Sequence, residues 1–266
     1  MSNFELIIQP TTTPVAFYIF GYPVRYYGLI ITVSMIVGFF LIGRFLEKRY
    51  STIEYDKFID YSIYLVIFSL IGARLFYVLG SIGFYLDNPS EIIMLHHGGI
   101  SIWGCIIFGF LGLYILSKIF KFSFSPHSAC ILVFLPLCQA IGRFGNYFNQ
   151  EAFGAPSNCF IKLFVESSYR PKEFIDVPYF HPAFLYESIL DLIIFVILLL
   201  TFKKDYPKVT IFLYLILYSI ARLLVESIRI DSILNISSIP VASVISSVAL
   251  VIGIVGLILS LKKPQN

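Results

Sequence analysis

Long apolar segments alternate with short polar ones along almost the whole chain. A helix needs about 20 consecutive, mostly apolar residues to cross the hydrocarbon core of a bilayer. Seven segments are long enough or nearly so, and we expect transmembrane helices at residues 24–46, 58–80, 98–120, 128–147, 182–202, 209–227 and 239–261. The pattern therefore predicts an all-α integral membrane protein with seven transmembrane helices, built as one domain over residues 1–266.

The composition agrees with a membrane protein. Hydrophobic residues make up 58% of the chain and charged residues 13%, whereas a soluble domain carries about 25% charged residues. The net charge of +3 is small and the basic residues are dispersed, so no nucleic-acid partner is expected. The four cysteines lack ligand spacing, which favours neither a disulfide framework nor a metal site. The N-terminus lacks a basic region and a cleavage site, so no removable signal peptide is expected.

The loops differ in their content of Lys and Arg, which predicts the orientation of the chain in the membrane. Of the 19 basic residues, eleven fall in alternate loops on one side: Arg44, Lys48, Arg49, Lys57, Lys118, Lys121, Lys203, Lys204, Lys208, Lys262 and Lys263. The opposite side has Lys162, Arg170 and Lys172, all in the long connection over residues 150–180. We therefore expect the N-terminus outside, the C-terminus in the cytoplasm, and a small extracytoplasmic head at 150–180, between the fourth and fifth spans.

The basic residues that remain lie in or beside the apolar segments, and all of them are arginine: Arg25, Arg74, Arg143, Arg222 and Arg229. At about 1.5 Å of rise per residue, the second, third and fourth of these lie roughly 20–24 Å from the cytoplasmic face of a core about 30 Å thick. Polar groups from several spans thus converge in the outer half of the membrane. Arginine binds phosphate bidentately and stays charged when desolvated, so this level predicts a phospholipid substrate. The alternative is that each charge reaches the interface or pairs with a neighbour.

Other polar residues reach the same level from the third, fifth and sixth spans. Tyr218, Arg222, Glu226 and Arg229 are spaced four, four and three apart, which puts them on one helical stripe. Such an Arg–Glu pair acts either as a structural clasp or as a support for a functional arginine. Other candidates with equally open roles enter the membrane from this side: Glu187, His97, Gly98, Gly99, Ser101, Trp103 and His181. For the glycines the alternatives are a re-entrant bend and simple helix packing, and for His181 a base and a satisfied surface histidine.

The segment "GRFGNYFNQEAFG" at residues 142–154 resembles the signature of the bacterial phosphatidylglycerol–prolipoprotein diacylglyceryl transferase family, G-R-x-G-N-F/Y-x-N-x-E-x-x-G. Supporting motifs occur in the family's order: "YYG" near the first span, "GAR" in the second, "GGISIWG" opening the third, "HPAFLYE" opening the fifth and R-x-x-x-E-x-x-R closing the sixth. The resemblance extends over essentially the whole chain.

This resemblance implies transfer of a diacylglyceryl group from phosphatidylglycerol to the lipobox cysteine in the signal peptide of a prolipoprotein. The products are a thioether and glycerol-1-phosphate, with no metal or organic cofactor, at the outer leaflet of the bacterial cytoplasmic (inner) membrane. Arg143 and Arg222 would hold the lipid phosphate. Glu151 and Asn146 complete the implied catalytic set, and the implied binding residues are Tyr27, His97, Gly98, Gly99, Trp103, Gly154, His181, Tyr218, Glu226 and Arg229.

One departure from the family pattern concerns the base. Many members carry His in a G-G-x-x-x-H-G pattern where this chain has Trp103, so a histidine base does not carry over to that position. A positive field can activate a thiol without a dedicated base, and the released phosphate can take the proton. The remaining candidates are, in order, Glu151, His97 and His181.

Two other classes of protein fit the sequence less well than an enzyme of this family. A lipid or anion transporter with the same arginines is expected to show internal symmetry and polar residues through the inner half of the membrane. The inner halves of these spans are apolar, and the two halves of the chain share no hydropathy pattern. An intramembrane protease is disfavoured because the chain has neither paired intramembrane aspartates nor HExxH.

Overall fold

The computed structural model describes residues 5–10, 13–50, 55–94, 99–203, 205–230, 235–236 and 239–262. The chain divides into two compact units. The larger unit consists of Met1–Phe40 and Ile131–Asn266, and the smaller unit of Leu41–Cys130. His97 and Gly98, two of the predicted site residues, lie outside the described residues.

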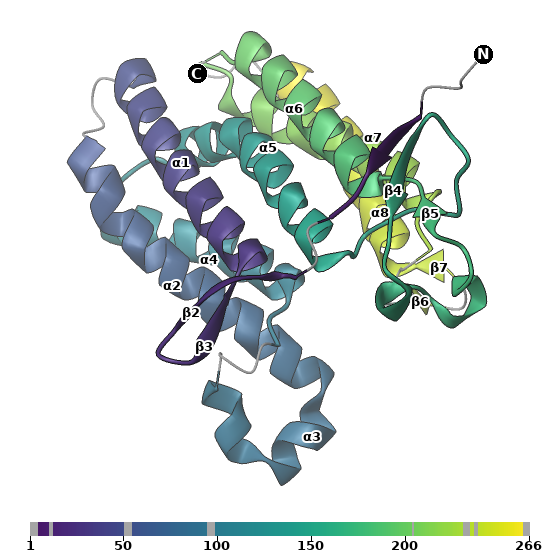
Figure 1. Ribbon diagram of the computed structural model, residues 1–266. Helices are drawn as coiled ribbons and strands as arrows, with labels where there is room; N and C mark the ends of the chain where they lie inside the picture. The colour runs from purple at the N-terminus through teal and green to yellow at the C-terminus, as the bar shows by residue number, and fades with distance from the viewer. Residues whose placement is uncertain are drawn as a thin grey trace. The chain divides into compact units, whose positions relative to one another are not determined.

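Helices account for most of the described chain (Figure 1). They are α1 (Tyr26–Arg49), α2 (Tyr55–Gly80), α3 (Ile82–Asp87), α4 (Ile102–Ile119), α5 (Phe124–Asn149), α6 (Ala183–Thr201), α7 (Pro207–Glu226) and α8 (Val241–Lys262). Six of them are long and apolar enough to cross a membrane, namely α1, α2, α5, α6, α7 and α8. Each coincides with a predicted span, with ends that differ by at most four residues.

The third predicted span is shorter than expected. Its helix, α4, has 18 residues, or about 27 Å of helix, and its apolar part is Trp103–Ile119. The prediction began at residue 98, but Ser101 has an extended backbone and donates its N–H to the Ala73 carbonyl. Apolar composition alone does not distinguish this extended lead-in from a turn of helix.

Glycines in the smaller unit bring α2 and α4 into close contact. A Cβ built on Gly72 would overlap Phe108 and lie 2.5 Å from the Gly104 carbonyl oxygen. Along the same pair of helices, a Cβ on Gly112 would lie 2.7 Å from the Phe68 Cβ. Small residues at such positions allow membrane helices to pack backbone against backbone. The helix-packing alternative concerned Gly98 and Gly99, but the glycine of "GGISIWG" that packs between α2 and α4 is Gly104.

Arg74 has a structural role within the smaller unit. Its guanidinium donates to the carbonyl oxygens of Glu91, Ile92 and Gly99 at 2.5, 2.9 and 2.6 Å, and the side chain is buried. Gly99 has a φ of +82°, and a Cβ there would lie 2.6 Å from Arg74 Nη1. A glycine is thus needed where the backbone turns towards the guanidinium. Arg74, expected with the other outer-half arginines, holds the segment between α2 and α4, which includes the 3-10 helix η1 (Pro89–Ile93).

The larger unit brings α1 and α5 together in a similar way. A Cβ on Gly145 would lie 2.5 Å from the Tyr27 ring, and a Cβ on Gly38 would lie 2.5 Å from Cys138 Sγ. Between these points, Ser34 Oγ donates to the Cys138 carbonyl at 2.8 Å. Gly145, a glycine of the 142–154 motif, is therefore explained by the ring that lies against it.

The predicted head forms a folded element, but it also contains a segment from outside residues 150–180. Strand β4 (Ile161–Phe164) pairs in parallel with β1 (Leu6–Ile8) and antiparallel with β5 (Tyr179–Phe180). The side chains of Phe153, Leu163, Val165, Phe180 and Phe184 form its core. An N-terminal strand thus joins the head expected at 150–180, and Lys162 pairs with Glu5 at 2.7 Å. Two short 3-10 helices, η3 (Ser167–Tyr169) and η4 (Lys172–Phe174), complete the connection.

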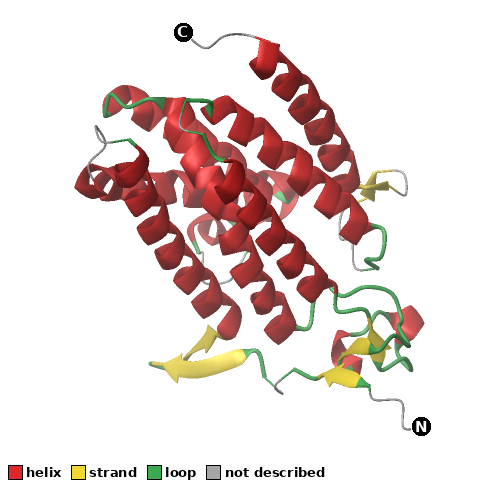
Figure 2. Ribbon diagram, turned by 90° about the horizontal axis from the view of Figure 1, so that it is seen from above, coloured by secondary structure: helices red, strands yellow, loops and turns green. Residues whose placement is uncertain are grey.

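The predicted helical fold class is confirmed, and the short strands are additions to it. Besides the strands of the head, they form two small hairpins, β2–β3 (Val15–Ile19 and Tyr22–Arg25) and β6–β7 (Asn235–Ile236 and Ile239–Pro240). Within the larger unit, the strands lie in the segments that flank the helices, and Figure 2 shows them as short arrows. Segments of two to five residues are too short to show a strand period, which is why the hydropathy pattern missed them. The first predicted span began at residue 24, but residues 24 and 25 belong to β3.

The close α2–α4 packing predicts opposite outcomes for two glycines of one helix. Gly72→Ala places a methyl group against backbone and should lower the thermal unfolding midpoint in detergent, because overpacking costs about 1–3 kcal/mol. Gly80→Ala is the matched control, since a Cβ there meets nothing within 4 Å. It should leave the midpoint unchanged or raise it slightly. Equal midpoints for the two variants would contradict the packing argument.

Candidate active site

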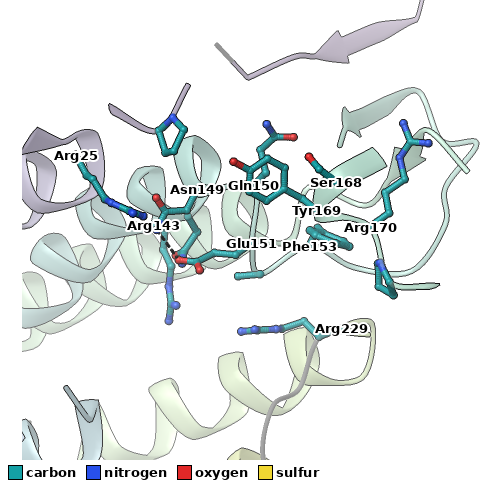
Figure 3. A pocket seen from close by; sticks show the side chains of 14 residues that line it. Arg25, Arg143, Asn149, Gln150, Glu151, Phe153, Ser168, Tyr169, Arg170 and Arg229 are labelled. Atoms are coloured by element: carbon teal, nitrogen blue, oxygen red, sulfur yellow. Dashed lines mark hydrogen bonds between the residues drawn. The ribbon is translucent and has the colours of Figure 1, made fainter. Parts of the chain in front are cut away.

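A pocket of about 700 Å³ lies in the larger unit, where α5 ends and the head begins (Figure 3). Its lining is dominated by polar side chains, and it draws on the end of β3, the end of α5, the head and the segment after α7. The lining residues are Pro14, Arg25, Arg143, Asn146, Asn149, Gln150, Glu151, Ala152, Phe153, Ser168, Tyr169, Arg170, Pro171 and Arg229. The structure thus brings Arg143, Asn146, Glu151 and Arg229, all predicted site residues, to one cavity.

The last turn of α5 fixes the position of Glu151. Its Oε1 accepts hydrogen bonds from Asn146 Nδ2 at 3.0 Å and from Asn149 Nδ2 at 3.2 Å. Gln150 and Ala152 have φ values of +51° and +56°, and these two residues turn the chain out of the helix. The chain therefore leaves the helix before it reaches Gly154. Both asparagines of the motif therefore serve to orient one carboxylate at the pocket wall.

Gly154 is needed for close packing instead. Its N–H donates to the His181 carbonyl at 2.9 Å, and a Cβ would lie 2.8 Å from His181 Cβ and 3.1 Å from the Ile228 carbonyl oxygen. The next N–H, of Ala155, donates to that Ile228 carbonyl at 2.8 Å. Gly154 also forms a β-bridge with Arg229. The motif thereby joins the segments before α6 and after α7, and this contact places Arg229 at the pocket.

Behind the pocket, Glu187 of α6 holds arginines from two neighbouring helices. Its carboxylate oxygens lie 2.5 Å from Arg143 Nε of α5 and 2.5 Å from Arg222 Nη1 of α7. Arg229 Nη1 lies 3.6 Å away. Arg222 also pairs through Nη2 with Glu226 at 2.6 Å, which is the pair that the stripe in the sixth span predicted. The Glu187 side chain is 5% exposed, so the charges are paired in a poorly hydrated setting.

Asp191 completes this cluster and was not singled out from the sequence. It lies one turn after Glu187 on α6, is buried, and has its Oδ2 3.8 Å from Arg143 Nε. Three arginines, 143, 222 and 229, therefore face three carboxylates, 187, 191 and 226, so the formal charges balance. The sequence signal for Asp191 was its i, i+4 spacing from Glu187, which puts two acidic residues on one face of an apolar span.

The two predicted tyrosines lie at different places around the arginines. Tyr218 stacks on Tyr214 with ring centroids 5.5 Å apart, and it lines a small cavity together with Arg143 and Arg222. That cavity, about 10 Å³, is at the limit of holding one water molecule. Tyr27 lies against Gly145 at the start of α1. The Tyr218 side chain thus lies beside two guanidinium groups, whereas the Tyr27 ring lies against the helix that carries Arg143.

The remaining predicted residues do not line the pocket in the part of the chain that the structure describes. His181 Nδ1 lies 3.3 Å from the Tyr186 hydroxyl, and its backbone joins the head to α6. Gly99 and Trp103 belong to the smaller unit. Within the described residues, no group of three or more His, Cys, Asp or Glu side chains is placed to hold a metal. The guanidinium and amide donors of the pocket are suited to an anion.

The comparisons with known proteins agree with this chemistry. The sequence matches the family described as "Prolipoprotein diacylglyceryl transferase" over residues 14–259. The chain belongs to this family. It is a multi-pass membrane protein of a bacterial family, as its apolar helices indicate. The resemblance seen in the 142–154 motif is confirmed.

Similar proteins come from diverse bacteria, and each of the following is named phosphatidylglycerol–prolipoprotein diacylglyceryl transferase. A relative from Clostridium novyi is 38% identical over 253 residues, which cover 93% of this chain and 95% of the relative. One from Thermosynechococcus vestitus is 37% identical over 236 residues, covering 88% and 87%. One from Staphylococcus aureus is 38% identical over 243 residues, covering 91% and 86%.

The contacts of Glu187 predict that its charge is needed for stability. Glu187→Gln leaves Arg143 and Arg222 without their shared carboxylate and should lower the free energy of unfolding by about 3 kcal/mol, the lower end for a broken buried pair. The loss stays at this lower end because both arginines keep part of their surface exposed. Thermal and denaturant unfolding in detergent measure the change. Glu173→Gln, on the exposed surface of the head, is the control. Equal stability of the two variants would contradict this role.

Proposed function

We propose that this protein transfers the diacylglyceryl group of phosphatidylglycerol to the lipobox cysteine of prolipoproteins, the first step of bacterial lipoprotein maturation. The family to which it belongs is named for this reaction. The structural observation that supports it most directly is the pair Arg143 and Arg222, both held on Glu187 beside a polar pocket at the ends of apolar helices. Such an arrangement suits a lipid whose phosphate lies at the membrane surface and whose chains remain in hydrocarbon.

The orientation that fits this substrate puts the pocket on the outer side of the cytoplasmic membrane. Arg25 precedes the start of α1, Asn149 ends α5, and Glu226 ends α7, so the pocket lies at one end of these helices. The opposite ends of the larger helices carry lysines such as Lys48 and Lys262. By the positive-inside rule, the lysine-bearing ends are cytoplasmic and the site faces the outer leaflet, with the N-terminus outside and the C-terminus inside.

The reaction exchanges one bond for another at a glycerol carbon. The cysteine thiolate attacks the carbon that bears the phosphate, a C–S bond forms, and the C–O bond to phosphate breaks. The electron pair stays on the departing oxygen, so the leaving group is glycerol-1-phosphate. Arg143 and Arg222 stabilise the charge that develops on this phosphate. Because Glu187 already orients both guanidinium groups, little reorganisation is needed when the charge forms.

We propose that Glu151 is the base that accepts the proton of the cysteine thiol. Its carboxylate lies at the pocket wall, and the amides of Asn146 and Asn149 fix its direction. Glu151 is the acidic residue that lines the pocket in the described part of the chain. His181 is a weaker candidate because its ring lies beside Tyr186. In this scheme neither a metal nor an organic cofactor takes part, and the membrane is the source of the lipid.

The proposed function is tested directly with purified protein. We expect incubation with phosphatidylglycerol and a lipobox peptide to add the mass of one diacylglyceryl group to the peptide cysteine, with release of one equivalent of glycerol-1-phosphate. A peptide with Cys replaced by Ser should remain unmodified. Transport of the lipid across vesicles without any mass shift would favour a transporter and overturn the proposal.

The geometry of the guanidinium, rather than charge alone, should matter at position 143. Arg143→Lys replaces a planar fork with a point charge, and kcat should fall by a factor on the order of 100. The same change at an exposed position, Arg44→Lys, is the control and should leave kcat unchanged. Full transferase activity in the Arg143→Lys protein would exclude bidentate recognition of the phosphate.

A further inference from the structure

Arg25 is a pocket residue that the mechanism above does not use. It is the last residue of β3, its side chain is exposed, and it lines the pocket. Figure 3 shows its guanidinium directed towards Asn149 and Glu151. Among the residues that the structure describes, no ion pair or side-chain hydrogen bond engages it. Arg25 therefore presents its donors to the cavity.

The other lining arginines are already engaged. Arg143 and Arg229 contact Glu187 at 2.5 and 3.6 Å. Arg170 donates through Nε and Nη1 to the carbonyls of Val165 and Ile175, both at 2.7 Å, and points away from the cavity in Figure 3. An anion that enters the pocket must compete with carboxylates or carbonyls for these groups. At Arg25 it meets a guanidinium that can bind without such competition.

The backbone around Arg25 is held on both sides. Val15 of β2 pairs with Arg25 across the hairpin, and the Tyr26 N–H donates to the Pro14 carbonyl at 3.0 Å. The Tyr26 ring stacks on Phe148 of α5 with centroids 4.5 Å apart and an interplanar angle of 18°. These contacts tie the start of α1 to the end of α5. The Arg25 side chain is thus delivered to the pocket by a fixed backbone, which lowers the entropy cost of ligand binding.

We propose that Arg25 is the outer ligand of the glycerophosphate group. It contacts the head group of the lipid donor as this enters, and the glycerol phosphate product as this leaves towards water. This inference rests on the proposed function, since that function supplies both ligands. Asn149 and Glu151 offer hydrogen-bonding partners to the glycerol hydroxyls beside it. Arg143 and Arg222 bind the phosphate during the reaction, while Arg25 sets how readily it arrives and departs.

The test compares wild type with Arg25→Gln in two measurements. The first is the dissociation constant of sn-glycerol-1-phosphate, measured by calorimetry on the detergent-solubilised protein without any turnover. The second is KM and kcat for phosphatidylglycerol in mixed micelles. We expect both the dissociation constant and KM to rise about five- to tenfold, a modest loss for a charge-assisted bond because the residue is exposed. The value of kcat should stay within about twofold, since Arg25 does not hold the phosphate in the transition state.

Lys172→Gln is the matched control, because it removes one positive charge from the head at an exposed position outside the pocket lining. It should change neither constant. A rise in KM alone assigns Arg25 to the lipid head group and overturns the product half of the proposal, and a rise in the dissociation constant alone does the reverse. The whole proposal is overturned if neither the dissociation constant nor KM changes, or if Lys172→Gln has an equal effect. It is also overturned if kcat collapses while both constants stay unchanged. Absence of transfer by wild type, with glycerol phosphate still bound through Arg25, refutes the proposed function but not the site.

Discussion

The charge cluster around Glu187 is the constraint on which the larger unit depends. One carboxylate from α6 contacts an arginine of α5 and an arginine of α7, and its side chain is almost fully buried. An unpaired charge in this setting costs several kcal/mol, so each of the three helices requires the other two in their present positions. The cluster is a source of specificity in packing as well as of chemistry. Apolar helices can pack in many arrangements, whereas only a few arrangements keep the buried charges paired.

The parts of the 142–154 motif follow from this constraint. Gly145 allows α1 to approach α5, Asn146 and Asn149 orient Glu151, and Gly154 ties the head to the segment that carries Arg229. Arg143 alone of this motif enters the cluster. The motif thus contains one residue that meets the phosphate in the proposed reaction, surrounded by residues that set the position of their neighbours. The motif is long because its residues contact several segments, including α1 and the segment that carries Arg229.

Periodicity and composition predicted the helices well, because membrane spans are long and strongly apolar. The same signal failed at Leu6–Ile8, where three apolar residues form a strand whose partner lies more than 150 residues away. The shared depth of the arginines in the predicted spans indicated that a polar site exists. The sequence did not show that Glu187 bridges Arg143 and Arg222. Such contacts depend on how helices rotate about their axes, which hydropathy does not specify. Arg74 shows the opposite error, since its position fitted the outer-half pattern while its hydrogen bonds hold backbone carbonyls.

The balance of charge in the cluster has a consequence for a reaction between anions. Three arginines and three carboxylates are neutral together, so the resting site does not hold an excess of buried positive charge that would itself be costly. A phosphate that binds Arg143 or Arg222 makes the local charge negative unless a further cation is present. Arg25 is such a cation, and it stands where the cavity meets the outer end of α1. In the proposed reaction, the inner cluster supplies the geometry for the transition state, whereas the outer arginine supplies the charge that binds the anion as it enters and the more highly charged product before it leaves.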